Sequence, residues 1–243
     1  MNKIICGDCR DAMKRIASAS IALVITSPPY RAGKEYEKRT TVNEYKSFAE
    51  SWVAEIPRLV TSTGSFWLNL GYTKIGKNET LPLTYIYWQL VKMKLIQEVV
   101  WHYEGGMSYK KRFTHRTERW QWFSHDPDNV LFNLDDVRDL SLNRTIDKRN
   151  HPLGKNPTDY WYFNRVVSGT GKVKQKTIHP AQFPEAMIAR IILACSNEGD
   201  TILDPLMGSG TVGVVAKRLK RNFIGIEKER KYIKAARKRI NNA

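Results

Sequence analysis

The stretch TILDPLMGSGT, residues 201–211, decides the fold class of this 243-residue chain. Its first three residues form a short apolar run that predicts a buried strand, and a helical pattern begins at Thr211. Gly208 and Gly210 lie between the two, where a tight turn lets a nucleotide-like ligand approach the backbone at a helix N-terminus. A strand, a glycine loop and a helix in this order are typical of one unit of a parallel sheet.

Outward from this stretch, short apolar runs alternate with segments of helical spacing. We expect strands at residues 3–6, 21–26, 64–70, 98–102, 201–203 and 222–227. We expect helices at residues 12–16, 43–59, 81–95, 186–195, 211–219 and 229–240. This alternation predicts an α/β fold, a mostly parallel, twisted, Rossmann-like sheet with helices on both faces. No internal repeat is visible, so a single domain is expected over residues 1–243.

Residues 126–177 interrupt the alternation. They contain the segments DPDN, NHPLGKNP and SGTGK, which are rich in proline, glycine, asparagine and charge. Such a composition predicts an inserted, variable recognition region rather than part of the sheet. Aromatic residues lie among its basic residues, which suits nucleic-acid contact and equally suits an ordinary packed loop.

The composition describes a basic chain that can fold. Its hydrophobic content of 42% and aromatic content of 11% support a core and exclude a disordered basic tail. The formal net charge is +16, and +9 of it lies in residues 213–243. Basic residues 31–39 are expected to order over substrate, and residues 112–119 could track phosphates. Because basic stretches are often only solvated surfaces, charge alone leaves nucleic-acid binding open.

Several classes of protein are not expected. No apolar run reaches the length of about 18 residues that a membrane span needs, and the N-terminus is not a targeting peptide, so we expect a cytoplasmic protein without a membrane partner. Three cysteines argue against a disulfide framework. Cys6 and Cys9 have the spacing of a redox pair, a weak alternative, but no second pair for zinc exists. The histidines lack metal-ligand spacing, so no metal is expected.

A carboxylate supports the glycine loop as a ligand site. Glu227 ends the predicted strand 222–227, in the position from which a carboxylate binds both hydroxyls of a ribose. The loop lacks the third glycine of a dinucleotide fingerprint and the Gly-Lys-Ser/Thr ending of a P-loop. An adenosine ligand without a pyrophosphate therefore fits better than NAD or ATP. A glycine-rich turn that binds nothing is the alternative.

The second motif is TSPPY, residues 26–30, directly after a predicted buried strand. Two prolines cannot continue the ladder of a strand, so the chain must turn out of the sheet. The turn presents Ser27, the Pro28 carbonyl and Tyr30 at the edge where open α/β sheets bind ligands. The alternative is a structural turn with a packing tyrosine.

The two motifs together resemble those of the S-adenosylmethionine-dependent amino-methyltransferases of DNA, the N4-cytosine/N6-adenine family. The order, with Ser-Pro-Pro-Tyr first and the glycine loop last, resembles their beta group. The similarity extends to ICGDC at 5–9, GKNPTDYW at 154–161 and HPAQFPE at 179–185, and so covers most of the chain. Leu206 stands where the family usually has Phe, and Phe183 where it often has Lys.

The resemblance implies the Rossmann-like methyltransferase fold, S-adenosyl-L-methionine as cofactor and double-stranded DNA as substrate. A cognate restriction endonuclease and a second copy of the chain are candidate partners. The implied cofactor site comprises Asp8, Cys9, Asp204, Pro205, Leu206, Gly208, Ser209, Gly210, Thr211 and Glu227. The implied catalytic turn comprises Ser27, Pro28, Pro29 and Tyr30.

In that turn, the Ser27 Oγ and the Pro28 carbonyl would accept hydrogen bonds from the target amine and aim its lone pair at the methyl group. Tyr30 would stack on a base flipped out of the duplex. A strong base is not required, because the proton can leave after methyl transfer has made the nitrogen positive.

The first motif residue bears on the base. Thr-Ser-Pro-Pro-Tyr resembles the cytosine-N4 enzymes, whereas Asp at the serine position is more frequent in adenine-N6 enzymes. We therefore expect a site-specific cytosine-N4 DNA methyltransferase, solitary or part of a restriction-modification system, with adenine N6 as the alternative. RNA or protein glutamine is less favoured, because those enzymes have the glycine loop first. Cytosine C5 chemistry is not expected, since none of the cysteines follows proline. A non-catalytic nucleic-acid-binding module is the alternative from another class.

Overall fold

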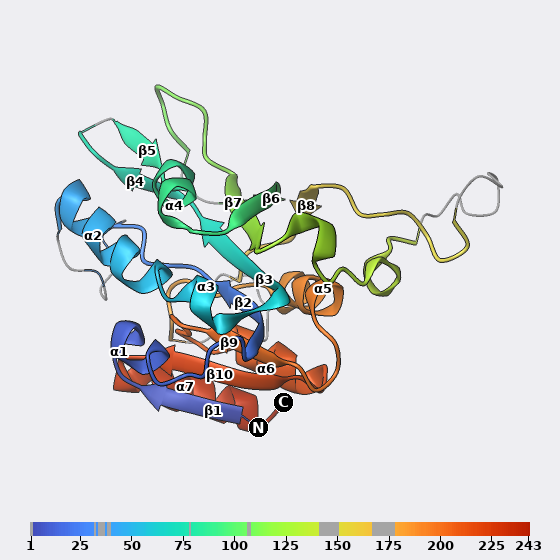
Figure 1. The fold of residues 1–243 in the computed structure, drawn as a ribbon. Helices are drawn as coiled ribbons and strands as arrows, with labels where there is room; N and C mark the ends of the chain where they lie inside the picture. Colours follow the sequence, from blue (N-terminus) through green and yellow to red (C-terminus); the bar gives the residue numbers. More distant parts are fainter. Residues whose placement is uncertain are drawn as a thin grey trace.

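The computed structural model describes residues 2–31, 33, 37, 40–77, 79–105, 108–140, 151–166 and 178–243. Its main element is an eight-stranded sheet in the order β1-β10-β9-β2-β3-β7-β6-β8 (Figure 1). The strands are β1 (Asn2–Cys6), β2 (Ile21–Thr26), β3 (Val60–Leu70), β6 (Lys94–His102), β7 (Thr117–Ser124), β8 (Tyr160–Tyr162), β9 (Thr201–Asp204) and β10 (Asn222–Glu227). Among these described strands, β7 alone runs antiparallel to its neighbours, β3 and β6.

A small antiparallel pair, β4 (Tyr72–Lys74) and β5 (Thr80–Pro82), lies beyond the end of β3. The helices are α1 (Cys9–Met13), α2 (Val42–Val53), α3 (Ile56–Leu59), α4 (Thr84–Leu90), α5 (Glu185–Cys195), α6 (Thr211–Arg218) and α7 (Arg230–Asn241), with 3₁₀ turns η1 (Pro127–Asn129) and η2 (Leu134–Val137). None of the helices in the described ranges is both long and apolar enough to span a bilayer.

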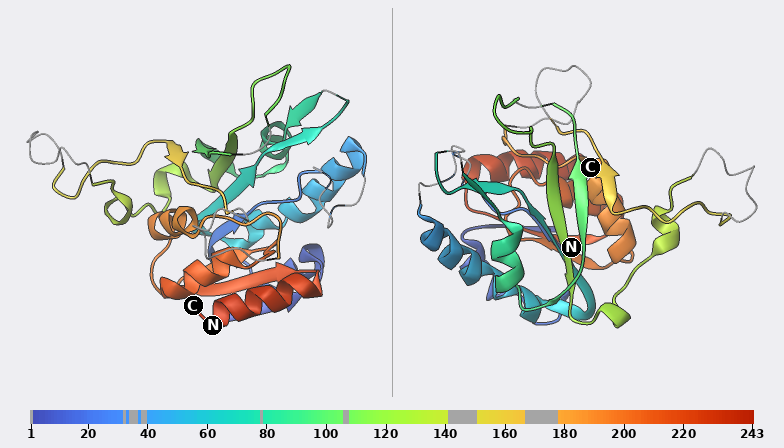
Figure 2. Two further views of the ribbon diagram at one scale, coloured as in Figure 1. Left: turned by 180° about the vertical axis from the view of Figure 1, so that it is seen from behind. Right: turned by 90° about the horizontal axis from the view of Figure 1, so that it is seen from above.

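Helices cover both faces of the sheet, so the expected α/β fold is confirmed (Figure 2). One core contains the apolar sides of α5, α6 and α7, and the other contains those of α1 to α4. Side chains of β2 alternate between the two cores: Leu23 and Ile25 point into the first, Ile21 and Val24 into the second. This two-sided burial explains why the inner strands read as continuous apolar runs.

The expected helix at 43–59 is two helices. The chain leaves α2 after Val53 and begins α3 at Ile56, with Pro57 in its first turn. Proline at that position cannot donate to the carbonyl of Val53 and its ring would collide with that carbonyl, so the long helix must break before it. The expected helix at 12–16 lies earlier, at α1, because Asp8 caps it by accepting the Arg10 N–H at 2.9 Å.

The expected helix at 81–95 is mostly wrong. Its first residues form β5, where Leu81 pairs with Thr73. Its last residues begin β6, which runs from Lys94 and is longer than the strand expected at 98–102. Only α4 between them is helical. Apolar residues in helical spacing continued across these boundaries, and the pairing with neighbouring strands overrode that local pattern.

Two strands were not predicted from the sequence. Strand β7 was missed because its charged beginning reads as loop and its end is buried on both faces, leaving no alternation. Strand β8 lies inside the stretch 126–177, which was expected outside the sheet. Trp161 of β8 is 7% exposed and faces Trp101 of β6 in parallel register. Part of that stretch is therefore sheet, and η2 places Val137 in the first core, while residues 151–155 extend to the side of the sheet (Figures 1 and 2).

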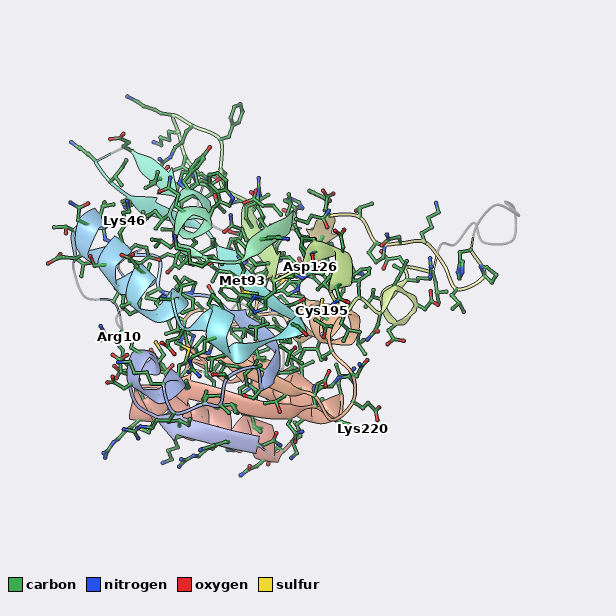
Figure 3. The ribbon with its side chains drawn as sticks, viewed as in Figure 1. Arg10, Lys46, Met93, Asp126, Cys195 and Lys220 are labelled. Atoms are coloured by element: carbon green, nitrogen blue, oxygen red, sulfur yellow. The ribbon has the colours of Figure 1, made fainter. Side chains whose placement is uncertain are left out.

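The parallel strands end at one edge of the sheet. Arg10, just after β1, and Lys46 on α2 lie on that side of the molecule, whereas Lys220, just before β10, lies on the other (Figure 3). The glycine loop after β9 and the proline turn after β2 both leave the sheet at the edge near Arg10, which brings the two motifs together.

Candidate active site

A cavity of about 330 Å³ lies at this edge, between the ends of the parallel strands. Thirteen of the fourteen expected site residues line it: Asp8, Cys9, Ser27, Pro28, Pro29, Tyr30, Asp204, Pro205, Leu206, Gly208, Ser209, Thr211 and Glu227. Gly210 is the exception. The two motifs thus line one cavity side by side, at the ends of the paired strands β2 and β9, although they lie far apart in the chain.

Two glycines shape the loop after β9. Gly210 is the N-cap of α6 and has a φ of 75°, and a Cβ there would lie 2.8 Å from the Cβ of Ala236 on α7. Its role is to let the two helices approach, which places it behind the cavity wall. Gly208 has a φ of 51°, and a Cβ there would lie 2.9 Å from the ring of His179. The loop therefore approaches both helix α7 and the segment before α5 more closely than other residues allow.

Asp204, at the end of β9, is a buried carboxyl group on the cavity wall. Its Oδ1 accepts hydrogen bonds from the Thr26 hydroxyl at 2.8 Å and from the Leu206 N–H at 3.1 Å. Burial raises the pKa of Asp204 from 3.8 to about 7, although these two hydrogen bonds oppose the shift. A positive group in the cavity would stabilise the ionised form.

Glu227, at the end of β10, ties the glycine loop to the next turn. Its two carboxylate oxygens accept the Gly208 N–H at 2.9 Å and the Glu229 N–H at 2.8 Å. Each oxygen has a second lone pair. The carboxylate is therefore held rigidly at the cavity wall and can still accept from two hydroxyl groups of a ligand.

The outer side of the glycine loop is braced by an arginine that the sequence did not single out. Arg239 of α7 donates to the Ser209 carbonyl at 2.8 Å and to the Thr211 hydroxyl at 3.1 Å. Its position is fixed by Glu185 at 2.9 Å, the first residue of α5. One of the positive charges in residues 213–243 thus belongs to a side chain that supports the glycine loop and is not part of a free surface.

The segment after β1 closes one side of the cavity. The Asp8 carboxylate is paired with Arg10 in addition to capping α1, and the Arg10 hydrogen bond lowers the pKa of Asp8. Burial raises the pKa of the Cys9 thiol to about 12, so Cys9 is not a reactive thiolate. The raised pKa of Cys9 therefore gives no support to a redox role for the Cys6–Cys9 pair.

The proline turn after β2 carries a connected set of polar groups. The Ser27 hydroxyl donates to the Tyr30 oxygen at 2.8 Å. The Tyr30 hydroxyl in turn lies 2.8 Å from the Asn69 Oδ1 and 3.1 Å from the Glu118 Oε2. Asn69 of β3 and Glu118 of β7 also line the cavity. Both escaped the sequence analysis, since β7 was not recognised and neither residue belongs to a motif.

Aromatic side chains form another part of the cavity lining. Phe183 and Trp101 line the cavity, and the Phe183 ring centroid lies 5.1 Å from that of buried Trp120. Phe183, which stands where the family often has Lys, is thus part of an aromatic wall. Arg165 also lines the cavity and lies over the ring of Tyr103 at 4.7 Å.

Most of the expected basic loop at residues 31–39 lies outside the described residues, as do 141–150 and 167–177 of the expected recognition region. Arg31 itself donates to the Thr40 carbonyl at 2.9 Å and to the Thr73 hydroxyl at 3.2 Å. Of the second basic stretch, residues 117–119 belong to β7, and Lys111 and Arg112 are exposed before it.

Comparison with known proteins bears on the family and the fold of this chain. A family model described as "DNA methylase" matches residues 21–238. The Type II methyltransferase M.ScaI of Streptomyces caespitosus is 40% identical over 237 residues, which cover 95% of this chain and 78% of that protein. Among solved structures, the cytosine-N4-specific PvuII DNA methyltransferase has a TM-score of 0.75 at 20% identity, covering 98% of this chain and 86% of the other. The M1.HpyAVI–SAM complex has a TM-score of 0.65 at 24% identity, covering 99% and 100%.

Proposed function

The chain belongs to the N6/N4 DNA methylase family, and on that basis we propose that it transfers a methyl group from S-adenosyl-L-methionine to the N4 amine of a cytosine in double-stranded DNA. The observation that carries the proposal is the single cavity shared by the glycine loop and the Ser-Pro-Pro-Tyr turn. Both reactants must meet in one place, because methyl transfer requires the nitrogen in line with the methyl carbon.

The residues present suit S-adenosyl-L-methionine. Glu227 is fixed by two backbone N–H groups with lone pairs to spare for ribose hydroxyls. Gly208 lets the loop pack against His179, which also lines the cavity, and buried Asp204 can balance a positive charge. Asp8 and the Cys9 backbone would hold the adenine edge, with Leu206 packing on it. When bound, this cofactor supplies an electrophilic methyl group on a positively charged sulfur.

At the adjacent proline turn, Ser27 and Pro28 would hold the target amine. The Ser27 proton is directed to Tyr30 at 2.8 Å, so the oxygen can accept one N–H of the amine while the Pro28 carbonyl accepts the other. These bonds bias the nitrogen toward tetrahedral geometry and free its lone pair. The aromatic wall formed by Trp101 and Phe183 offers a stacking surface to a flipped base, in addition to the ring of Tyr30.

Serine at the first motif position favours cytosine N4 over adenine N6, and PvuII methyltransferase, named for cytosine N4, has a similar fold. Adenine N6 is the second candidate, because its amine and adjacent ring nitrogen present the same edge to Ser27 and Pro28. A cognate endonuclease, a homodimer and sequence readout by residues 126–177 stay predictions.

The test uses methyl-labelled S-adenosyl-L-methionine and mixed-sequence duplex DNA, followed by digestion to nucleosides. We expect the label in N4-methylcytosine. Label in N6-methyladenine would overturn the assigned base but keep the reaction, and an absence of label in DNA would overturn the function itself. A Ser27→Ala protein prepared in parallel serves as the inactive control.

A further inference from the structure

The Ser27 hydroxyl can serve as an acceptor for the target amine only if its own proton points elsewhere. A hydroxyl carries one proton and two lone pairs, and in solution it turns freely. In the site, the Ser27 Oγ lies 2.8 Å from the Tyr30 oxygen. Which of the two hydroxyls donates in that contact decides whether Ser27 attracts or repels an N–H group.

The surroundings of Tyr30 decide the direction. Three further oxygens lie within hydrogen-bond distance of the Tyr30 hydroxyl: the Asn69 Oδ1 at 2.8 Å, the Asn69 carbonyl at 3.1 Å and the Glu118 Oε2 at 3.1 Å. All three accept, and an ionised carboxylate cannot donate. The Tyr30 proton is therefore directed toward them, and Ser27 must be the donor in its contact with Tyr30.

Of the two side chains in this set, Glu118 is the one that cannot become a donor; the Asn69 carbonyl also only accepts, but it carries no charge. The amide of Asn69 can turn over and present a donor in place of Oδ1, whereas a carboxylate accepts through either oxygen. Hydrogen bonds to a charged acceptor are also the stronger ones. Burial and the Glu118 charge raise the pKa of Tyr30 well above its usual value, so Tyr30 keeps the proton that the chain of bonds requires.

We propose that Glu118 is a positioning residue that acts through Tyr30, fixing the proton direction Ser27→Tyr30→Glu118 so that the Ser27 oxygen faces the substrate as an acceptor. This rests on the proposed function, in which Ser27 receives the amine. Tyr30 then has a hydrogen-bonding role beside any stacking on the base, and β7 contributes to the chemistry from 88 residues along the chain.

The variant Glu118→Gln keeps the shape of the side chain and introduces an amide that can donate to Tyr30. We expect single-turnover methyl transfer to fall at least about tenfold, less than the roughly 10²–10³ that loss of a direct hydrogen bond to a reacting group costs. Cofactor affinity is expected to stay at the wild-type value. The matched control is Glu98→Gln on the neighbouring strand β6, where Glu98 pairs with Gln121 away from the cavity.

The combination with Tyr30→Phe separates this role from a general electrostatic one. Without the Tyr30 hydroxyl the relay is absent, so Glu118→Gln should cause no further loss in the Tyr30→Phe protein, a fully non-additive pair. Losses that multiply would overturn the proposal, and so would an unchanged rate in Glu118→Gln alone.

A readout independent of activity is the ¹³C signal of the Tyr30 ring carbon that carries the hydroxyl. Substitution of Glu118 by Gln and of Ser27 by Ala should each move this signal, and Glu98→Gln should leave it in place. A Tyr30 signal that is unmoved by Glu118→Gln would overturn the relay even in a protein that methylates no DNA. Failure of the proposed function and failure of the relay are therefore distinguishable.

Discussion

The two ends of the central sheet hold their functional groups in different ways. In the cofactor half, formed by β1, β10 and β9 with α6 and α7, backbone N–H groups position the Glu227 carboxylate: Gly208 and Glu229 both donate to it. In the substrate half, formed by β2, β3, β7, β6 and β8, side chains position one another, as Ser27, Tyr30 and Glu118 do.

This difference shows how each half fixes the positions of its functional groups. A backbone-held site depends on a loop conformation that a few glycines specify, so a short motif is enough to encode it. A site held by side chains depends on which strands are neighbours, and here the neighbours are β2, β3 and β7. Substitutions in the substrate half should therefore lower activity without weakening cofactor binding. Substitutions in the cofactor half should instead affect cofactor binding and stability.

The largest effect is expected from Ser27→Ala. Removal of an acceptor for the reacting amine should lower single-turnover methyl transfer by about 10²–10³, with unchanged cofactor affinity by calorimetry. Ser51→Ala on the exposed side of α2 is the matched control, since Ser51 only donates to the Phe48 carbonyl. Loss of cofactor binding in Ser27→Ala would break the separation of the two halves.

The second effect concerns Asp204 and pH. Its folded-state pKa of about 7 exceeds the ordinary value of 3.8, so the folded protein binds this proton more tightly than the unfolded chain does. The group's contribution to stability is therefore complete below about pH 4 and is lost as pH rises to about 7. The free energy of unfolding of the cofactor-free protein should fall by up to about 4 kcal/mol over that range.

Denaturant unfolding of the wild type and of Asp204→Asn between pH 4 and 8 tests this. The free energy of unfolding of Asp204→Asn should not show the part of the fall with pH that Asp204 causes. Asp11→Asn, at an exposed position beside Lys14, should behave as the wild type. Parallel pH profiles of the wild type and Asp204→Asn would show that the Asp204 carboxyl is not the titrating group.

A third effect separates binding from chemistry in the cofactor half. Glu227→Gln removes the charge that strengthens hydrogen bonds to ribose hydroxyls, so the cofactor Kd should rise about 10- to 100-fold. At saturating cofactor the methyl transfer rate should recover. A rate that stays low despite saturation would place Glu227 in the chemistry as well. Glu198→Gln, a surface residue paired with Lys220, is the control.

The smallest effect concerns charge. Lys110, Lys111 and Arg112 are exposed between β6 and β7, so their combined replacement by Ala should reduce the slope of log affinity for DNA against log salt by about 0.9 per lost phosphate contact. The matched variant replaces Lys234, Arg237 and Lys238 on α7, which are exposed in the cofactor half. A larger change in slope from the α7 variant would assign the DNA surface to the cofactor half.

The sequence was a good guide where structure is local. The glycine loop, the proline turn and the apolar strands beside them lie where their patterns predicted, because each is fixed by the conformational limits of a few adjacent residues. It was a poor guide around residues 81–124. There helix α4 is short, β6 begins early and β7 is antiparallel, since strand pairing outweighs local preference.

The sequence by itself therefore determined the α/β class, the family and the two motifs that line the cavity. Only the tertiary structure decided that Glu118 and Asn69 join Tyr30, that Arg239 braces the glycine loop, and that Gly210 serves packing. The physical reason is distance along the chain: Thr26 bonds to Asp204 across 178 residues, and no local pattern records such a contact. Motifs encode backbone shape, whereas the direction of a proton depends on neighbours that only folding brings together.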